Sequence, residues 1–95
     1  MIKVSQIAGG DPSQFEVLVS DDRGESRHLV TARTADLARL APGETSGRLI
    51  EAAFHFLLDR ESKESILSRF DITVIASYFP EFDREIGRYL KRTQS

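Results

Sequence analysis

Residues 48–79 decide the fold; they read RLIEAAFHFLLDRESKESILSRFDITVIASYF and hold most of the large apolar side chains. The first part predicts a long helix over residues 46–60, because apolar residues recur there at helical spacing and cover much of the circumference. Thr45 and Ser46 precede this helix and can accept hydrogen bonds from its first backbone N–H groups. The apolar face consists of Leu49, Ile50, Ala53, Phe54, Phe56, Leu57 and Leu58.

The second part of the stretch predicts two short helices with abrupt changes of direction between them. Ser62 is a candidate N-cap for the first, and Ile66 and Phe70 follow at helical spacing. Asp71 is a candidate N-cap for the second. Pro80 ends it, because a residue before proline is disfavoured in the α conformation.

Three segments nearer the N-terminus alternate apolar and polar residues, which is typical of half-buried strands. They cover residues 2–7, 14–20 and 27–32. The last two are joined by a tight connection in which Gly24 is able to take a positive φ. The residues expected to face the helices are Phe15, Val17, Val19, Val30 and Ala32.

The fold class predicted from these elements is α+β in a single domain. An N-terminal three-stranded antiparallel β-meander, residues 1–33, packs against a C-terminal helical layer, residues 45–92. That layer contains one long helix beside the sheet, two short helices and one terminal helix. The terminal helix follows from apolar residues at i, i+4, i+7 and i+8 after Pro80, and residues 34–40 suggest one more helical turn.

Composition narrows the classes of function. The formal net charge of −2 argues against general nucleic-acid affinity, which depends on neutralising phosphates. The absence of cysteine from the sequence excludes disulfides and thiolate chemistry. No segment approaches the roughly 20 apolar residues of a membrane span, and residues 1–5 are not an apolar leader. We therefore expect a cytoplasmic protein without a membrane partner.

Two leucines, Leu18 and Leu29, are out of phase with the expected core. They are predicted to lie on the sheet face opposite the helices. One interpretation is two scattered surface leucines, which are common. The other is a patch for self-association or for a partner protein, since only one helical layer is available to cover the sheet.

The last helix carries a basic stripe, composed of Arg84, Arg88, Lys91 and Arg92. Such a stripe could bind phosphate, an acidic protein or anionic lipid. A simpler interpretation is that acidic residues occupy the first turns and basic residues the last, as the helix dipole favours. Pairs of Glu81 with Arg84 and of Glu85 with Arg88 are also expected at i, i+3.

Glu51, His55 and Asp59 share one face of the long helix at i, i+4 and i+8. They are candidates for metal ligation or for a polarised histidine. A solvated helix face is the better interpretation, because a zinc site needs three convergent ligands and this spacing covers about 12 Å of helix axis. The sequence also lacks a phosphate loop and a nucleophile–histidine motif, so we predict no catalytic residue, cofactor or metal.

The end of the long helix holds two further charges. Arg60 and Glu61 are expected to form salt bridges at a helix junction, which contribute little if exposed. Tyr78 and Tyr89 each carry a hydroxyl that could line a cleft, although partly buried tyrosine is commoner.

Residues 54–82 read FHFLLDRESKESILSRFDITVIASYFPEF. This run resembles a segment of the type FLLxRExxxSILxxFDxxxIxxYFPE from a small bacterial family of proteins with no assigned function. The resemblance covers the C-terminal half well and the strands loosely. It implies a self-standing domain with N-terminal strands and implies no activity.

Because the sequence shows no group of residues typical of a catalytic, metal or cofactor site, the predicted function is a non-catalytic protein-interaction or regulatory module. Its surface would include Leu18, Leu29 and the basic stripe, and its partner would be another protein or a second copy. One alternative is a small nucleic-acid-binding regulator that uses the basic stripe. Another is a small metal-binding protein or enzyme around His55.

Overall fold

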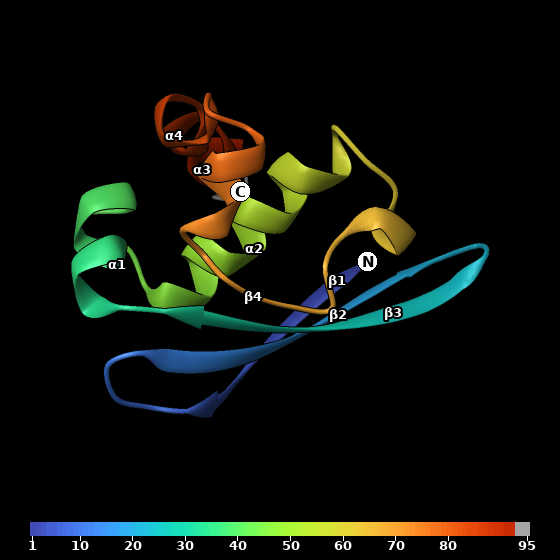
Figure 1. Cartoon of the computed structure of the whole chain (residues 1–95), viewed down its shortest axis with the longest axis horizontal. Coiled ribbons are helices and arrows are strands. Elements are labelled where there is room, and N and C mark those ends of the chain that lie inside the picture. The colour runs from blue at the N-terminus through green and yellow to red at the C-terminus, as the bar shows by residue number, and fades with distance from the viewer. Residues whose placement is uncertain (93–95) are drawn as a thin grey trace.

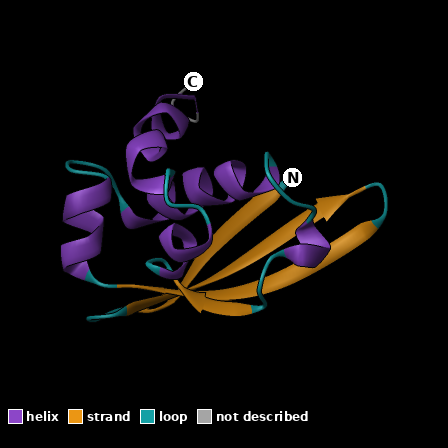
Figure 2. Ribbon diagram, turned by 45° about the horizontal axis from the view of Figure 1, so that its top comes forward, coloured by secondary structure: helices purple, strands orange, loops and turns teal. Residues whose placement is uncertain are grey.

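The computed structural model describes residues 1–92 and has an α+β fold with its helices on one side of a twisted sheet (Figure 1, Figure 2). The strands run in the order β1-β2-β3-β4. The elements are β1 (Ile2–Ala8), β2 (Ser13–Asp21), β3 (Gly24–Ala32), α1 (Thr34–Leu40), α2 (Ser46–Leu58), a 3₁₀ turn η1 (Lys63–Ser65), β4 (Arg69–Asp71), α3 (Val74–Tyr78) and α4 (Phe82–Arg92).

The predicted antiparallel meander is confirmed for β1, β2 and β3. Val17 pairs with His28 and Asp21 with Gly24 in the β2–β3 hairpin, and Gly24 takes the expected positive φ of 133°. Alternation decides which face is buried, because successive side chains point to opposite faces of a strand. The five residues expected to face the helices are all buried: Phe15, Val17, Val19, Val30 and Ala32.

The sheet has a fourth strand that the sequence analysis did not predict. Where a short helix capped by Ser62 was expected, the chain forms the turn η1 and then the strand β4. β4 lies parallel to β3, with Phe70 opposite Val30. Extra backbone hydrogen bonds join Leu29 N to Ser68 O and Ile72 N to Thr31 O, both at 2.8 Å. The helical prediction was wrong because pairing with the open edge of β3 outweighs local helical spacing.

The long helix α2 lies between the sheet and α4 (Figure 1). Thr45 caps it as predicted, since its side chain accepts a hydrogen bond from Arg48 N at 3.3 Å. The wide apolar face is buried on two sides, against the strands and against the helices above. Buried residues of α2 are Leu49, Ile50, Ala52, Ala53, Phe54, Phe56 and Leu57.

An aromatic cluster joins α2 to the C-terminal helices. The ring of Phe56 meets Phe79, Phe82 and Tyr89 edge-on, with centroids 5.0–6.0 Å apart. Edge-to-face contacts of this kind are favourable beyond the area they bury. The helical turn predicted over residues 34–40 is confirmed as α1, so the helical layer starts before residue 45. Within residues 1–92, no helix combines the length and apolarity needed to cross a membrane.

Candidate binding pocket

The two leucines of the predicted interaction surface alternate with the buried residues of β2 and β3, so they lie on the sheet face opposite the helices, and both are half-buried. In the strand register Leu18 is flanked by Lys3 and Arg27, whereas Leu29 is flanked by Glu16 and Arg69. An ion pair between Arg27 and Glu16 crosses this face. The leucines therefore sit among charged neighbours, and an interaction through them stays a prediction.

The basic stripe of α4 is partly engaged within the chain. Arg88 pairs with Glu85 at 2.8 Å, as the i, i+3 spacing predicted. Arg92 reaches Asp59 at 3.3 Å and lies over the Tyr89 ring. The predicted Glu81–Arg84 pair is replaced, because Glu81 accepts from Arg60 instead. The stripe is thus divided between intramolecular pairs and the exposed residues Arg84 and Lys91.

The polar face around His55 is also divided. His55 Nε2 lies 3.8 Å from Glu51, as the i, i+4 spacing allows. Asp59 turns away toward α4 and accepts a hydrogen bond from the Tyr89 hydroxyl at 2.6 Å. In the part of the chain that the structure describes, no group of three or more histidine, aspartate or glutamate side chains is arranged to hold a metal ion.

Arg60 confirms the expected salt bridge at the end of α2. Its Nε donates to Glu81 at 2.9 Å, and its Nη1 donates to the Phe56 carbonyl at 3.2 Å. The guanidinium carbon lies 3.6 Å from the centroid of the Phe56 ring, within cation–π range. Its pKa is raised because hydrogen bonds to Tyr89 and Glu81 outweigh the opposing effect of burial.

The expectation of a salt bridge was wrong for the next residue, Glu61. Its carboxylate has no hydrogen bond or ion pair with any of residues 1–92. Arg60 points to Glu81, and the next basic residue, Lys63, pairs with Asp21 at 2.9 Å and with Glu64. Partial burial raises the pKa of Glu61 above its usual value, and no opposing cause acts on it.

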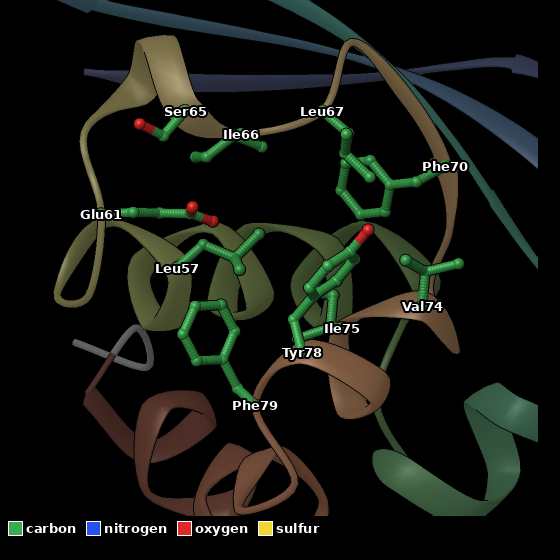
Figure 3. Close-up of a pocket in the computed structure, with 10 residues that line it drawn as sticks. All are labelled: Leu57, Glu61, Ser65, Ile66, Leu67, Phe70, Val74, Ile75, Tyr78 and Phe79. Atoms are coloured by element: carbon green, nitrogen blue, oxygen red, sulfur yellow. The ribbon is translucent and has the colours of Figure 1, made fainter.

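Glu61 lies at one end of an apolar pocket of about 160 Å³ (Figure 3). The floor and walls come from the C-terminal end of α2, from η1 and the loop after it, from β4 and from α3. Figure 3 shows the Glu61 side chain extending across this space toward Leu57 and Ile66, with the Tyr78 hydroxyl at the opposite end. The lining residues are Leu57, Glu61, Ser65, Ile66, Leu67, Phe70, Val74, Ile75, Tyr78 and Phe79.

The outer wall of the pocket is tied to the sheet. Buried His28 on β3 binds the Leu67 carbonyl through Nδ1 at 2.8 Å and Ser26 Oγ through Nε2 at 2.8 Å. Its Nδ1 must donate because a carbonyl oxygen only accepts. Together with β4 pairing, this bond fixes the loop over residues 66–68 at a distance from α3. The pocket is the space left between them.

The inner wall changes from strand to helix at Asp71. Its side chain accepts from the backbone N and the hydroxyl of Thr73 at 3.1 and 2.7 Å, and from the Thr31 hydroxyl at 2.6 Å. An aspartate bonded to the backbone two residues ahead forms a local turn. This turn ends β4 and starts α3, which brings Val74, Ile75 and Tyr78 to the pocket.

Sequence reasoning assigned the apolar residues of this segment to the core and missed the pocket. Phe54 and Phe56 are indeed fully buried, but Ile66, Phe70, Ile75 and Phe79 also line the opening. Leu67 and Tyr78 on the pocket rim remain 46% and 66% exposed although they lie in the most apolar stretch, and their residue types alone do not indicate this. Hydrophobicity alone does not reveal that these side chains leave a pocket open to solvent.

The comparisons of this chain with models of protein families, with curated proteins and with solved structures all returned no match. The function of the chain must therefore be inferred from the geometry of the pocket.

Proposed function

We propose that the chain is a non-catalytic protein-interaction module whose pocket takes one apolar side chain of a partner protein. The observation that carries the proposal is an apolar pocket, open to solvent, with two exposed apolar residues on its rim. Scattered exposed leucines are ordinary on a protein surface. A concave apolar lining that stays open to solvent offers a site that an apolar side chain could enter.

The size of the pocket supports a single side chain as its occupant. A cavity of about 150 Å³ in another protein accommodates benzene, and the volume here is similar, at about 160 Å³. Pockets for cofactors and drug-sized ligands are larger, roughly 300–1,000 Å³. An isobutyl or benzyl side chain has the right size, whereas a nucleotide or a flavin does not.

The rim supports a contact surface that extends beyond the anchor. Tyr78 and Leu67 stand on either side of the opening, and both keep much of their surface exposed. Aromatic residues around an apolar pocket are typical of the well-packed centre of protein interfaces. A partner whose side chain enters the pocket would bury both rim residues.

The polar groups of the pocket support binding rather than nucleophilic catalysis. They belong to Glu61, Ser65 and Tyr78. The Ser65 hydroxyl contacts Ser62 Oγ at 3.3 Å, and a serine nucleophile would need a base such as histidine in that position. His28, which lies behind the pocket wall, already uses both ring nitrogens.

A selection from a phage-displayed random peptide library tests this proposal. The immobilised proteins are the wild type, a variant with a filled pocket, Val74→Phe, and a variant of the outer sheet face, Leu29→Thr. We expect enriched peptides that share an apolar residue, bind the wild type and Leu29→Thr equally, and lose at least tenfold in affinity for Val74→Phe.

Thermal unfolding followed by circular dichroism establishes that each variant is folded. Failure to enrich peptides over an unrelated protein would overturn the proposal. Peptides that bind Val74→Phe normally but not Leu29→Thr would overturn the pocket and move the interface to the face that carries Leu18 and Leu29.

A further inference from the structure

We infer that the pocket selects a partner segment in which a positive charge lies beside the apolar anchor, because Glu61 offers it an unpaired carboxylate. This inference rests on the proposed function and specifies the chemistry of the partner. The occupant is a peptide segment of another protein with a lysine or arginine next to the side chain that enters the pocket.

Glu61 is held in place by the end of α2. It lies three positions after Leu58, the last residue of α2, and its backbone is tied to the helix end by a hydrogen bond from Glu61 N to Leu57 O at 2.9 Å. The side chain lies over the apolar lining between Leu57 and Ile66 (Figure 3). A carboxylate in this position is partly shielded from water by apolar groups, which strengthens its attraction for a cation.

The Glu61 carboxylate has no counterion among residues 1–92. The two basic residues nearest in sequence, Arg60 and Lys63, are both committed to other acids. Lys63 is almost fully buried, with 3% of its surface exposed, so it is not available to swing toward the pocket. Across residues 1–92, no ion pair or hydrogen bond reaches the Glu61 carboxylate.

Glu61 is the only charged residue among those that line the pocket. Besides Glu61, the lining consists of Ser65 and Tyr78, which each carry a hydroxyl group, and of seven apolar residues. A partner with an acidic group at this place would meet an uncompensated carboxylate and be rejected. A partner with a cation would form a charge-assisted hydrogen bond, which is about twice as strong as a neutral one.

Three aromatic probes that share a benzyl group and differ in charge test the inference on the full chain. They are benzylamine, benzyl alcohol and phenylacetate, titrated at pH 7.5 into ¹⁵N-labelled protein and followed by amide chemical shifts. We expect benzylamine to shift the amides of residues 65–79 and to bind about tenfold more tightly than the other two. Glu61→Gln should remove this advantage and leave benzyl alcohol binding unchanged.

Two control variants separate the pocket from general electrostatics. Glu51→Gln removes the same charge from an exposed part of α2 and should keep the preference for benzylamine. Val74→Phe should reduce the binding of all three probes. Circular dichroism and the dispersion of the amide spectrum show that each variant is folded.

The outcomes distinguish the inference from the proposed function. Equal binding of the three probes, sensitive to Val74→Phe, would overturn the charge selection and leave the apolar anchor site intact. Benzylamine binding that survives Val74→Phe would place the probe on an acidic surface elsewhere and overturn the inference. Absence of binding by all three probes would overturn the pocket as a binding site.

The peptide selection then tests the class of the partner. Enriched peptides should carry lysine or arginine within two residues of the shared apolar position, and selection on Glu61→Gln should lose this bias. Preference for benzylamine without a basic bias among the peptides would overturn a peptide partner and favour a small amine.

Discussion

The last turn of α2 leads into two neighbouring residues, Arg60 and Glu61, whose surroundings differ completely. Arg60 faces α4, where it binds Glu81, Tyr89 and the Phe56 carbonyl and covers the Phe56 ring. Glu61 faces the pocket, and its carboxylate is bound by none of residues 1–92. One side of the helix end is closed by its own polar network, and the other side is open.

This difference indicates where the chain can bind something else. A closed network satisfies its donors and acceptors within the fold, so a partner gains little by approaching it. A partly buried acid without a counterion costs stability, because desolvation is not compensated. Folds tolerate such a cost at functional sites, where the missing partner is supplied on binding.

The largest effect that separates the two sides is expected from their apolar residues. Phe56→Ala removes the ring at the centre of the closed side and should lower the free energy of unfolding by about 3–5 kcal/mol. Val74→Ala removes two methyl groups from the half-buried pocket wall and should cost about 1 kcal/mol or less. Urea unfolding followed by circular dichroism measures both, and equal costs would contradict the comparison.

The next effect concerns the polar network. Arg60→Met keeps an aliphatic cover over Phe56 but removes the donors to Glu81 and to the Phe56 carbonyl. We expect a loss of about 1–2 kcal/mol, reduced from the full value of charged hydrogen bonds because Arg60 is partly exposed. Arg88→Met is the matched control, since its pair with Glu85 lies on the surface with Arg88 72% exposed, and it should change the free energy by less than about 0.5 kcal/mol.

The sequence predicted more of the closed side, where Arg60 lies, than of the open side, where Glu61 lies. The meander and α2 were predicted because strand alternation and a wide helical stripe are local patterns, and both are confirmed. The Thr45 cap was predicted for the same reason. The salt bridge of Arg60 was predicted in kind, although its partner on α4 was not.

The open side was not predictable, because it depends on contacts between residues far apart. β4 is a strand of three residues whose pairing with β3 crosses about 40 positions of sequence, as from Val30 to Phe70. The spacing of Ile66 and Phe70 is the same whether the segment forms a helix or lines a pocket. α2 ends at Leu58 and not at residue 60, where the sequence predicted its end. The position of this end decides that Arg60 faces α4 and that Glu61 faces the pocket.

Acid should weaken the closed side. The hydrogen bond from Tyr89, and then that from Arg92, lower the pKa of Asp59 below its usual 3.8, and Arg60 lowers the pKa of Glu81 below 4.5. An acid with a lowered pKa in the folded state stabilises the fold above its unfolded pKa and loses that contribution as the pH falls through the folded value.

Tyr89→Phe tests this pH dependence, since it removes the main cause of the Asp59 shift. We expect a loss of roughly 0.5 kcal/mol at pH 7, small because Asp59 is about half exposed. The loss should shrink as the pH falls below about 4. Chemical unfolding of both proteins across this range measures it, and a loss that is constant with pH would point to packing instead.

Glu61→Gln tests the open side. It is expected to change the free energy of unfolding least and to increase it, whereas the preceding substitutions decrease it. Because burial raises the folded pKa of Glu61 above 4.5, the folded state binds a proton more tightly than the unfolded state. Its contribution to stability is therefore lost as the pH rises from the unfolded pKa through the folded one. Replacing the carboxylate by a neutral amide should raise the free energy of unfolding at pH 7 by up to about 0.5 kcal/mol.

The pH dependence distinguishes this gain from a general effect of charge. As the pH falls below the unfolded pKa, the carboxyl group becomes protonated in both states, so the difference in unfolding between the wild type and Glu61→Gln should disappear. Their difference should grow toward pH 7, whereas Glu51→Gln should show a smaller gain because 45% of the Glu51 side chain is exposed and it lies beside His55. A Glu61→Gln protein that is less stable than the wild type at pH 7 would mean that the fold itself holds this carboxylate in place. The open side would then be closed like its neighbour, and the reason to seek a cationic partner there would disappear.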